Sequence, residues 1–213
     1  MISIGHLLTF TLIATIIIVI PGPSVLFVIG RALAHGRRTA LASVVGNAIG
    51  AYVLVVLVSV GAGTLVERSA TLFFALRLAG AAYLVYLGVQ AWRHRRSMRA
   101  VLDRAAPDRG RRRAIWDGFV VGVTNPKTIV FFGAVLPQFI DRGAGNAPAQ
   151  MLVLGLIFVV IALVSDSIWG LVASTARSWF ARSPRRLEAV GGVGGLALVG
   201  LGITVAATGQ HRT

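Results

Sequence analysis

Six long apolar runs constrain the fold of this chain more than any other feature of its sequence. Each is about as long as the 20 or so residues that cross the hydrocarbon core of a bilayer as a helix. The runs are residues 5–30, 39–65, 70–91, 115–140, 149–173 and 187–207. Only 13% of the residues are charged and 56% are hydrophobic, whereas soluble domains carry about 25% charged residues. The sequence therefore predicts an all-α integral membrane protein.

Arginines gather in every second connection between these runs. Connections one, three and five hold 16 of the 21 basic residues, and the opposite side holds 3. Cytoplasmic loops of membrane proteins carry such an excess of basic residues. We therefore expect a multi-pass protein of the bacterial cytoplasmic (inner) membrane, with connections one, three and five in the cytoplasm and both termini outside. The net charge of +14 lies in loops beside membrane lipids, and no nucleic-acid partner is expected.

The longest hydrophilic segment, the basic linker 93–113, divides the chain into two halves. Residues 1–92 and 114–213 hold three runs each, so the second half must be inverted in the membrane. The first run of each half is interrupted near its middle, by P-G-P at residues 21–23 and by N-P-K at residues 125–127. Paired interruptions of this kind indicate the substrate site of a transporter. We predict one transporter domain of two inverted three-helix repeats, with helices one and four broken near the midplane.

The P-G-P segment predicts a helix break and not a mild kink. Pro21 and Pro23 lack backbone N–H groups, so carbonyls one turn earlier lose their helical donors. Unwound backbone at membrane depth is tolerated only inside the protein or beside a water-filled cavity. Ser24 is expected to cap the helix that follows. Together with Gly22, these residues form the first half of the predicted substrate site.

The N-P-K segment follows the same logic with polar side chains added. Pro126 suits the first position of a new helix, and Asn125 and Thr124 are expected to cap it. Lys127 is the only lysine, against 20 arginines, and an ionisable residue deep in a span is a candidate functional residue. Its ammonium and the positive end of the new helix favour an anionic group such as a carboxylate. The alternative is a structural ion pair between Lys127 and Asp166.

Three further polar residues lie within predicted spans. Asp166 shares a helical face with small residues, which predicts a position inside the bundle. Its carboxylate either carries a coupling proton, holds a substrate ammonium, or pairs with Lys127 or Arg77. Arg77 is therefore a possible ion-pair partner. Asn47 either lines the substrate cavity or makes a hydrogen bond between closely packed helices.

Other chemistry is poorly supported by the sequence. There is no cysteine, and the four histidines are scattered without paired spacing, so no metal site is predicted. No nucleophile–base set, phosphate-binding loop or dinucleotide fingerprint occurs, so we predict neither an enzyme nor a cofactor. The Gly191-x-x-x-Gly195 pair is typical of close helix packing, either within one subunit or in a homodimer.

Two stretches resemble the signatures of a known family. They are P-G-P-S-V-L-F-V at residues 21–28 and G-F-V-V-G-V-T-N-P-K-T-I-V-F-F at residues 118–132. With P-Q-F at residues 137–139, the chain resembles the bacterial lysine exporter (LysE/RhtB-type, homoserine/threonine exporter) family from residue 3 to about 207. The resemblance implies a carrier that exports amino acids or related metabolites, driven by the proton gradient. It also implies a central site built from the P-G-P and N-P-K segments, with Asp166 as an acidic partner.

The sequence thus predicts a secondary active exporter whose small-molecule substrate is an amino acid or a close derivative. Proton antiport with alternating access is the expected mechanism. Family members often carry asparagine where this chain has Ser24, which leaves the particular substrate open. Two other functions remain open as well: efflux of a different cationic or toxic solute or of a metal ion, and a non-transporting role as a membrane scaffold subunit.

Overall fold

The computed structural model describes most of the chain. The described residues are 2–68, 70–93, 110–141, 143 and 145–176, with isolated positions between 183 and 206. Within these residues the chain is helical and contains no strand. Most of the linker and of the sixth predicted run, including Gly191 and Gly195, lie outside the described residues.

Three continuous helices coincide with predicted runs. α3 spans Arg37–Arg68, α4 spans Ala70–Arg93 and α8 spans Ala147–Thr175. Among the described residues, Arg37–Gly61 of α3 and the whole of α8 are long and apolar enough to cross a membrane. These helices match the second, third and fifth predicted runs.

The first and fourth runs are bent helix pairs. α1 (Ile4–Val19) and α2 (Pro23–His35) meet at 47°. α6 (Arg111–Thr124) meets α7 (Pro126–Val130) and the turns that follow it at 41°. Those turns are a π-helical segment at Phe131–Val135 and a 3-10 segment at Leu136–Phe139. Both breaks lie where the sequence predicts them, and each pair has the length and composition of one span, which gives up to four candidate spans in the described part.

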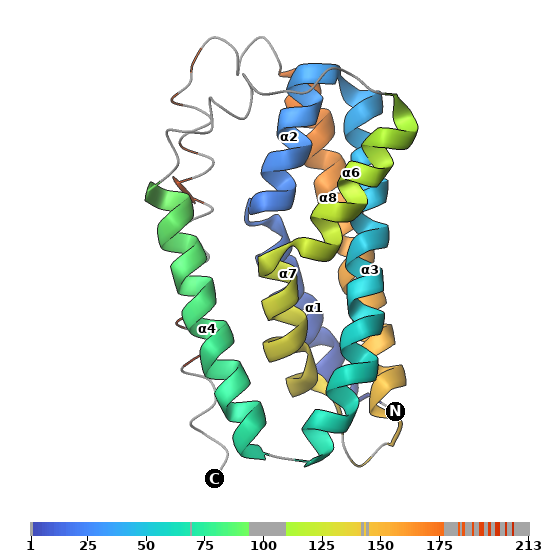
Figure 1. Cartoon of the computed structure of the whole chain (residues 1–213), viewed down its shortest axis with the longest axis vertical. Helices are drawn as coiled ribbons and strands as arrows, with labels where there is room; N and C mark the ends of the chain where they lie inside the picture. Colours follow the sequence, from blue (N-terminus) through green and yellow to red (C-terminus); the bar gives the residue numbers. More distant parts are fainter. Residues whose placement is uncertain are drawn as a thin grey trace.

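The two bent pairs run in opposite directions. In Figure 1, α1 leads upward into α2, whereas α6 leads downward into α7, and both breaks lie midway along the molecule. The upper end in this view holds the end of α2 and the starts of α3 and α6. Only Gly36, with φ of 81°, joins α2 to α3. The first connection is therefore shorter than predicted, because glycine allows an abrupt reversal and Arg31 and Arg37 belong to the helices.

Glycines hold α3 and α6 in backbone contact. Two G-x-x-x-G pairs form this seam, Gly46 and Gly50 in α3 and Gly118 and Gly122 in α6. A Cβ atom at Gly118 would lie 2.1 Å from the carbonyl oxygen of Ser43, and one at Gly122 would lie 2.2 Å from that of Asn47. Small residues allow such close approach of membrane helices. Both pairs have the G-x-x-x-G spacing on which the packing prediction for Gly191 and Gly195 rests, but no such prediction was made for them.

Two apolar clusters fill the interior, with a buried polar layer between them. One cluster contains the packed rings of Phe10, Phe131 and Phe158. The other joins α2, α3 and α8 through residues such as Val28 and Ala173. The bent first run, α3 and α8 each pass in sequence order from one cluster through buried polar residues to the other. The polar residues are Ser24, Asn47, Asn125, Lys127, Thr128, Ser165 and Asp166.

We expect Gly118→Ala to destabilise the protein, because the added methyl group would collide with a backbone oxygen and force α3 and α6 apart. Overpacking of this kind costs about 1–3 kcal/mol. Gly61→Ala is the matched control, since a Cβ atom there meets no atom within 4 Å. Thermal unfolding of the two purified variants in detergent measures the difference. Equal melting temperatures would contradict the proposed role of the glycine seam.

Candidate substrate site at the two helix breaks

The first break leaves backbone carbonyls at the end of α1 without donors from their own helix. In a continuous helix the carbonyl of Ile17 would accept from residue 21, but Pro21 has no N–H. Ile20 ends α1 in an extended conformation. Gly22 is the N-cap residue of α2 and Pro23 begins that helix. The polar ends of two half-helices therefore meet inside the protein.

Lys127 supplies the missing donors. Its Nζ atom donates to the carbonyl oxygens of Ile17 and Ile20, at 3.1 Å each. The side chain is only 3% exposed and runs past Gly22, where a Cβ atom would lie 3.0 Å from Nζ. Glycine between the two prolines thus leaves room for the lysine. The ammonium caps the negative end of α1 and keeps one of its three N–H donors for another partner.

Asn125 connects the two breaks. Its Oδ1 atom accepts the backbone N–H of Lys127 at 3.1 Å, so it caps α7 as predicted, with Pro126 in the first turn. Its Nδ2 atom donates to the hydroxyl oxygen of Ser24 at 3.1 Å. The two interrupted spans are therefore held together by side chains from the second break.

Two of the predicted caps are wrong. Ser24 makes no capping bond in α2, where Gly22 is the N-cap residue without a side-chain hydrogen bond; its hydroxyl serves Asn125 instead. The Thr124 hydroxyl donates to the carbonyl of Val120 at 2.6 Å. Thr124 is the last residue of α6, so the nearest acceptor for its hydroxyl is one turn back in the same helix.

Asp166 lies in the same polar layer and is bound by Asn47. It is 3% exposed, and Asn47 Nδ2 donates to its carboxylate at 2.9 Å. Asn47 Oδ1 is buried without a hydrogen-bond partner. Lys127 and Asp166 interact electrostatically, but the described ion pairs within 4.0 Å do not join them. The direct ion pair considered from the sequence is not formed, because backbone carbonyls hold the lysine and an amide holds the carboxylate.

These groups have complementary capacities. The layer contains a buried cation with a remaining donor, a buried anion, and an amide oxygen that lacks a donor. A zwitterion can satisfy all three, because its carboxylate suits Lys127 and its ammonium suits Asp166 and Asn47 Oδ1. Buried polar groups are otherwise costly when unpaired. The arrangement is therefore suited to binding an α-amino acid.

Two further predictions concern the partner of Arg77 and metal binding. Arg77 lies in α4, but its side chain is outside the described part of the structure, so its pairing with Asp166 stays a prediction. Among the described side chains, no group of three His, Asp or Glu residues is arranged to hold a metal ion.

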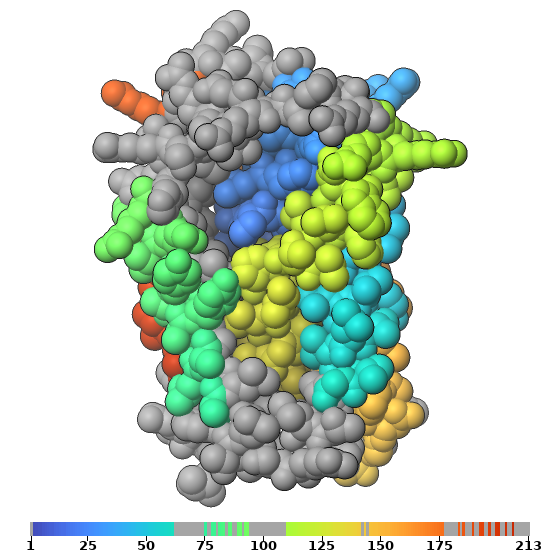
Figure 2. Space-filling model, in the orientation of Figure 1, coloured from blue at the N-terminus to red at the C-terminus, as the bar shows by residue number. Residues whose placement is uncertain are grey.

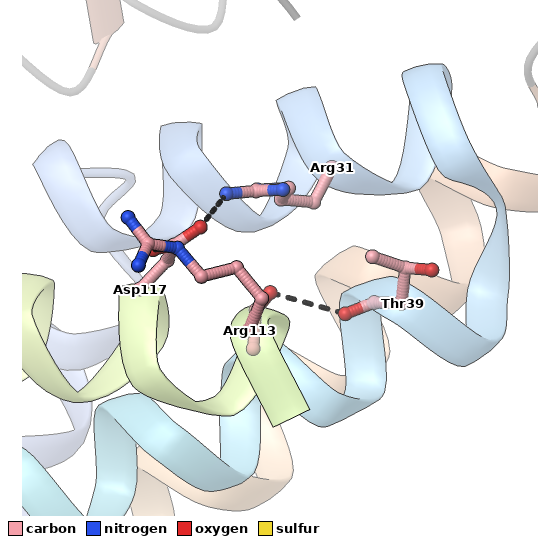
Figure 3. Close-up of polar contacts among 5 residues, drawn as sticks. Arg31, Thr39, Arg113 and Asp117 are labelled. Atoms are coloured by element: carbon pink, nitrogen blue, oxygen red, sulfur yellow. Dashed lines mark hydrogen bonds and ion pairs between the residues drawn. The ribbon is translucent and has the colours of Figure 1, made fainter. Parts of the chain in front are cut away.

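A charged contact joins α2 to α6 on the basic side of the polar layer (Figure 3). The carboxylate of Asp117 accepts from the guanidinium of Arg31, and also from Arg113 Nε at 2.9 Å. Ser24, Phe27 and Arg31 recur at helical spacing on one face of α2, and Arg31 lies over the Phe27 ring at 5.2 Å. Asp117 was not among the predicted site residues, although an acidic residue four positions after Arg113, the last of three consecutive arginines, indicates an ion pair within one helix.

We expect Asn125→Ala to lower the melting temperature more than Ser3→Ala does. Both remove an N-cap side chain, a loss of about 0.5–2 kcal/mol. The change at residue 125 also leaves the buried hydroxyl of Ser24 without its donor, whereas Ser3 lies at the exposed start of α1. Thermal unfolding in detergent tests this, and equal shifts would show that the bond between the breaks does not stabilise the fold.

Comparison with known proteins identifies a family match and several relatives of this chain. Residues 15–209 match the family model described as LysE type translocator. The chain is 36% identical to a homoserine/homoserine lactone efflux protein of Salmonella typhimurium, over 87% of this chain and 86% of that protein. It is 30% identical to a leucine efflux protein of an Enterobacter species, over 93% of each. An uncharacterized membrane protein of Vibrio cholerae is 34% identical over 93% of this chain and 95% of its own. No solved structure gives a significant match.

Proposed function

Because the chain belongs to the LysE type translocator family, whose members are transporters and not enzymes, we propose that it exports amino acids or close derivatives across the cytoplasmic membrane. Relatives named for the efflux of homoserine, homoserine lactone and leucine support this substrate class. The observation that carries the proposal is the buried polar layer, in which Lys127 reaches from one interrupted span to the other and Asp166 is held by Asn47.

In this proposal the chain forms one transporter domain of six spans in two inverted repeats. Residues 1–92 form the first repeat, 93–113 the cytoplasmic linker and 114–213 the second repeat. The opposite directions of the two bent pairs support the inversion (Figure 1). The arginines at the starts of α3 and α6 lie at the same end of the molecule as the end of α2 (Figure 1), which supports a cytoplasmic location for that end.

The proposed substrate site uses both breaks. The substrate carboxylate binds the remaining N–H of Lys127, beside the start of α7 at Pro126 and the backbone of Pro21, Gly22 and Pro23. The substrate ammonium binds Asp166 and the free amide oxygen of Asn47. Ser24 and Asn125 hold the two breaks at the spacing that this binding requires.

The buried position of Asp166 supports proton antiport. A buried charge is stable only when it is paired or neutralised. When the substrate ammonium leaves, a proton takes its place on the carboxylate, and when substrate binds, the proton leaves. Exchange at one carboxylate would couple export to the inward flow of protons.

Alternating access requires the basic end to open and close. The Arg31–Asp117 contact joins α2 to α6 on the same face of α2 as the Ser24–Asn125 contact. Figure 2 shows a recess between α4 and α6 in which α2 is visible. We assign the Arg31–Asp117 pair to the closed cytoplasmic side, where it must break before substrate enters.

Transport measurements test the site directly. Proteoliposomes loaded with radiolabelled L-homoserine or L-leucine should release label through the wild-type protein when an opposing proton gradient is imposed. Asp166→Asn and Lys127→Arg should each lower the rate at least tenfold, since even one lost charged contact costs about 1.5–3 kcal/mol. Arginine keeps the charge but is too large beside Gly22.

Asp141→Asn is the matched control, because Asp141 lies in the loop after the 3-10 segment and away from the polar layer. It should transport at the wild-type rate. Normal efflux by Asp166→Asn would refute the site. Loss of gradient-driven efflux with retained exchange of internal for external substrate would support proton coupling at this residue, and equal loss of both would argue for ammonium binding alone.

Cysteine labelling tests the closed side, because the chain has no native cysteine. Ser24→Cys should react slowly with a charged thiol reagent added from the arginine-rich side, since residue 24 is 6% exposed. Adding Asp117→Asn should speed the reaction by freeing α2 from α6. Adding Arg113→Gln is the control, because Arg113 bonds Asp117 within α6 alone. Equal rates in all three proteins would remove the pair from the proposed mechanism.

A further inference from the structure

A groove of about 490 Å³ lies between the starts of α3 and α6, apart from the substrate site. Arg38 and Arg111 line it, and both side chains are exposed. Thr39 and apolar residues line the rest, chiefly Leu41, Val45 and Ile115. None of these residues belongs to the buried polar layer, so the groove has a separate role to explain.

The groove is strongly positive. Neither α3 nor α6 has an acidic residue in its first turn, and the positive ends of both helices add to the charge of the arginines. The nearest carboxylate along α6 is that of Asp117, which is already bound by Arg31 and Arg113. Neither Arg38 nor Arg111 takes part in an ion pair among the described residues. Among the described residues, an anionic ligand would therefore meet two guanidinium groups and no competing acid.

The apolar part of the groove lies one turn further along each helix. Leu41 and Val45 follow Arg38 at helical spacing, and Ile115 follows Arg111 at i+4, so charge gives way to hydrocarbon over about 5 Å. Val45 is 44% exposed, and the neighbouring Trp116 is 55% exposed and stacked on Phe119. An exposed tryptophan is typical of the headgroup level of a bilayer. The groove therefore has the polarity gradient of a phospholipid.

We propose that this groove binds an anionic phospholipid of the cytoplasmic leaflet, with its phosphate between Arg38 and Arg111 and an acyl chain along Leu41, Val45 and Ile115. Arginine is suited to phosphate because its planar guanidinium donates two parallel hydrogen bonds. Basic pockets between membrane helices on the cytoplasmic side are known to hold anionic headgroups. The assignment to the cytoplasmic leaflet rests on the orientation given under the proposed function. The ligand class rests on the charge and the apolar lining of the groove.

Lipid titration of the purified full-length protein tests the proposal. Delipidated protein in a neutral detergent is titrated with dioleoylphosphatidylglycerol or dioleoylphosphatidylcholine, and bound lipid is counted by native mass spectrometry. The wild type should prefer phosphatidylglycerol. Arg38→Gln with Arg111→Gln should weaken its binding about twenty-five-fold, since each arginine near an anionic headgroup contributes about a fivefold factor. Arg38→Lys with Arg111→Lys should recover part of the loss, because lysine keeps the charge but not the paired hydrogen bonds of arginine.

The matched control is Arg37→Gln with Arg112→Gln, which removes the same charge from the same two helices beside the groove. This pair should bind phosphatidylglycerol as the wild type does. Equal weakening by both glutamine pairs would show general attraction to negative charge and overturn the site. Equal binding of phosphatidylcholine and phosphatidylglycerol by the wild-type protein would overturn the headgroup assignment. Displacement of the lipid by an equal concentration of inorganic phosphate would show a site for a free anion instead.

Discussion

The bond between the Lys127 ammonium and the carbonyls of Ile17 and Ile20 is the interaction on which the rest of the site depends. Inside a membrane protein, a carbonyl without a donor costs several kcal/mol. The hydrogen bonds from Lys127 therefore stabilise the first break, and the two carbonyl oxygens in turn stabilise the buried cation. In the proposed mechanism, a substrate that binds Lys127 acts directly on the junction of α1 and α2, so binding and helix movement are linked through one side chain.

Close packing of α3 against α6 places the remaining polar groups around that bond. The glycine seam brings the backbone of Asn47 against Gly122, one turn before the second break. α8 packs against α3 at Gly155 and against α2 at Gly170, which brings Asp166 within reach of the Asn47 amide. Apolar clusters lie on both sides of this layer, so a polar group there is costly unless it finds a partner in the protein or in a ligand.

The arginines and the single lysine of this chain serve at different places because their charged groups differ in shape. Planar guanidinium groups serve at the basic end, where Arg31 and Arg113 meet Asp117 (Figure 3) and where Arg38 and Arg111 line the groove. The compact ammonium of the single lysine serves at the break, where the lysine side chain passes close to Gly22. Arginine suits flat, multidentate partners such as carboxylate and phosphate, whereas lysine suits a point between two carbonyls.

Features that depend on local covalent chemistry were predictable from the sequence. Proline removes a backbone donor in any context, so both breaks were predictable. The Asn125 cap was predictable from its position before Pro126, and the interior face of Asp166 from the small residues on the same helical face. The hydrogen-bond partners of these residues depend on the tertiary structure. Lys127 meets carbonyls that lie more than a hundred positions earlier in the chain, Ser24 serves Asn125 and not its own helix, and Asp166 binds Asn47 without a direct bond to Lys127. These partners depend on which helices touch and at what height, and that is set by the glycine seam and the packing of α8, which no local pattern specifies.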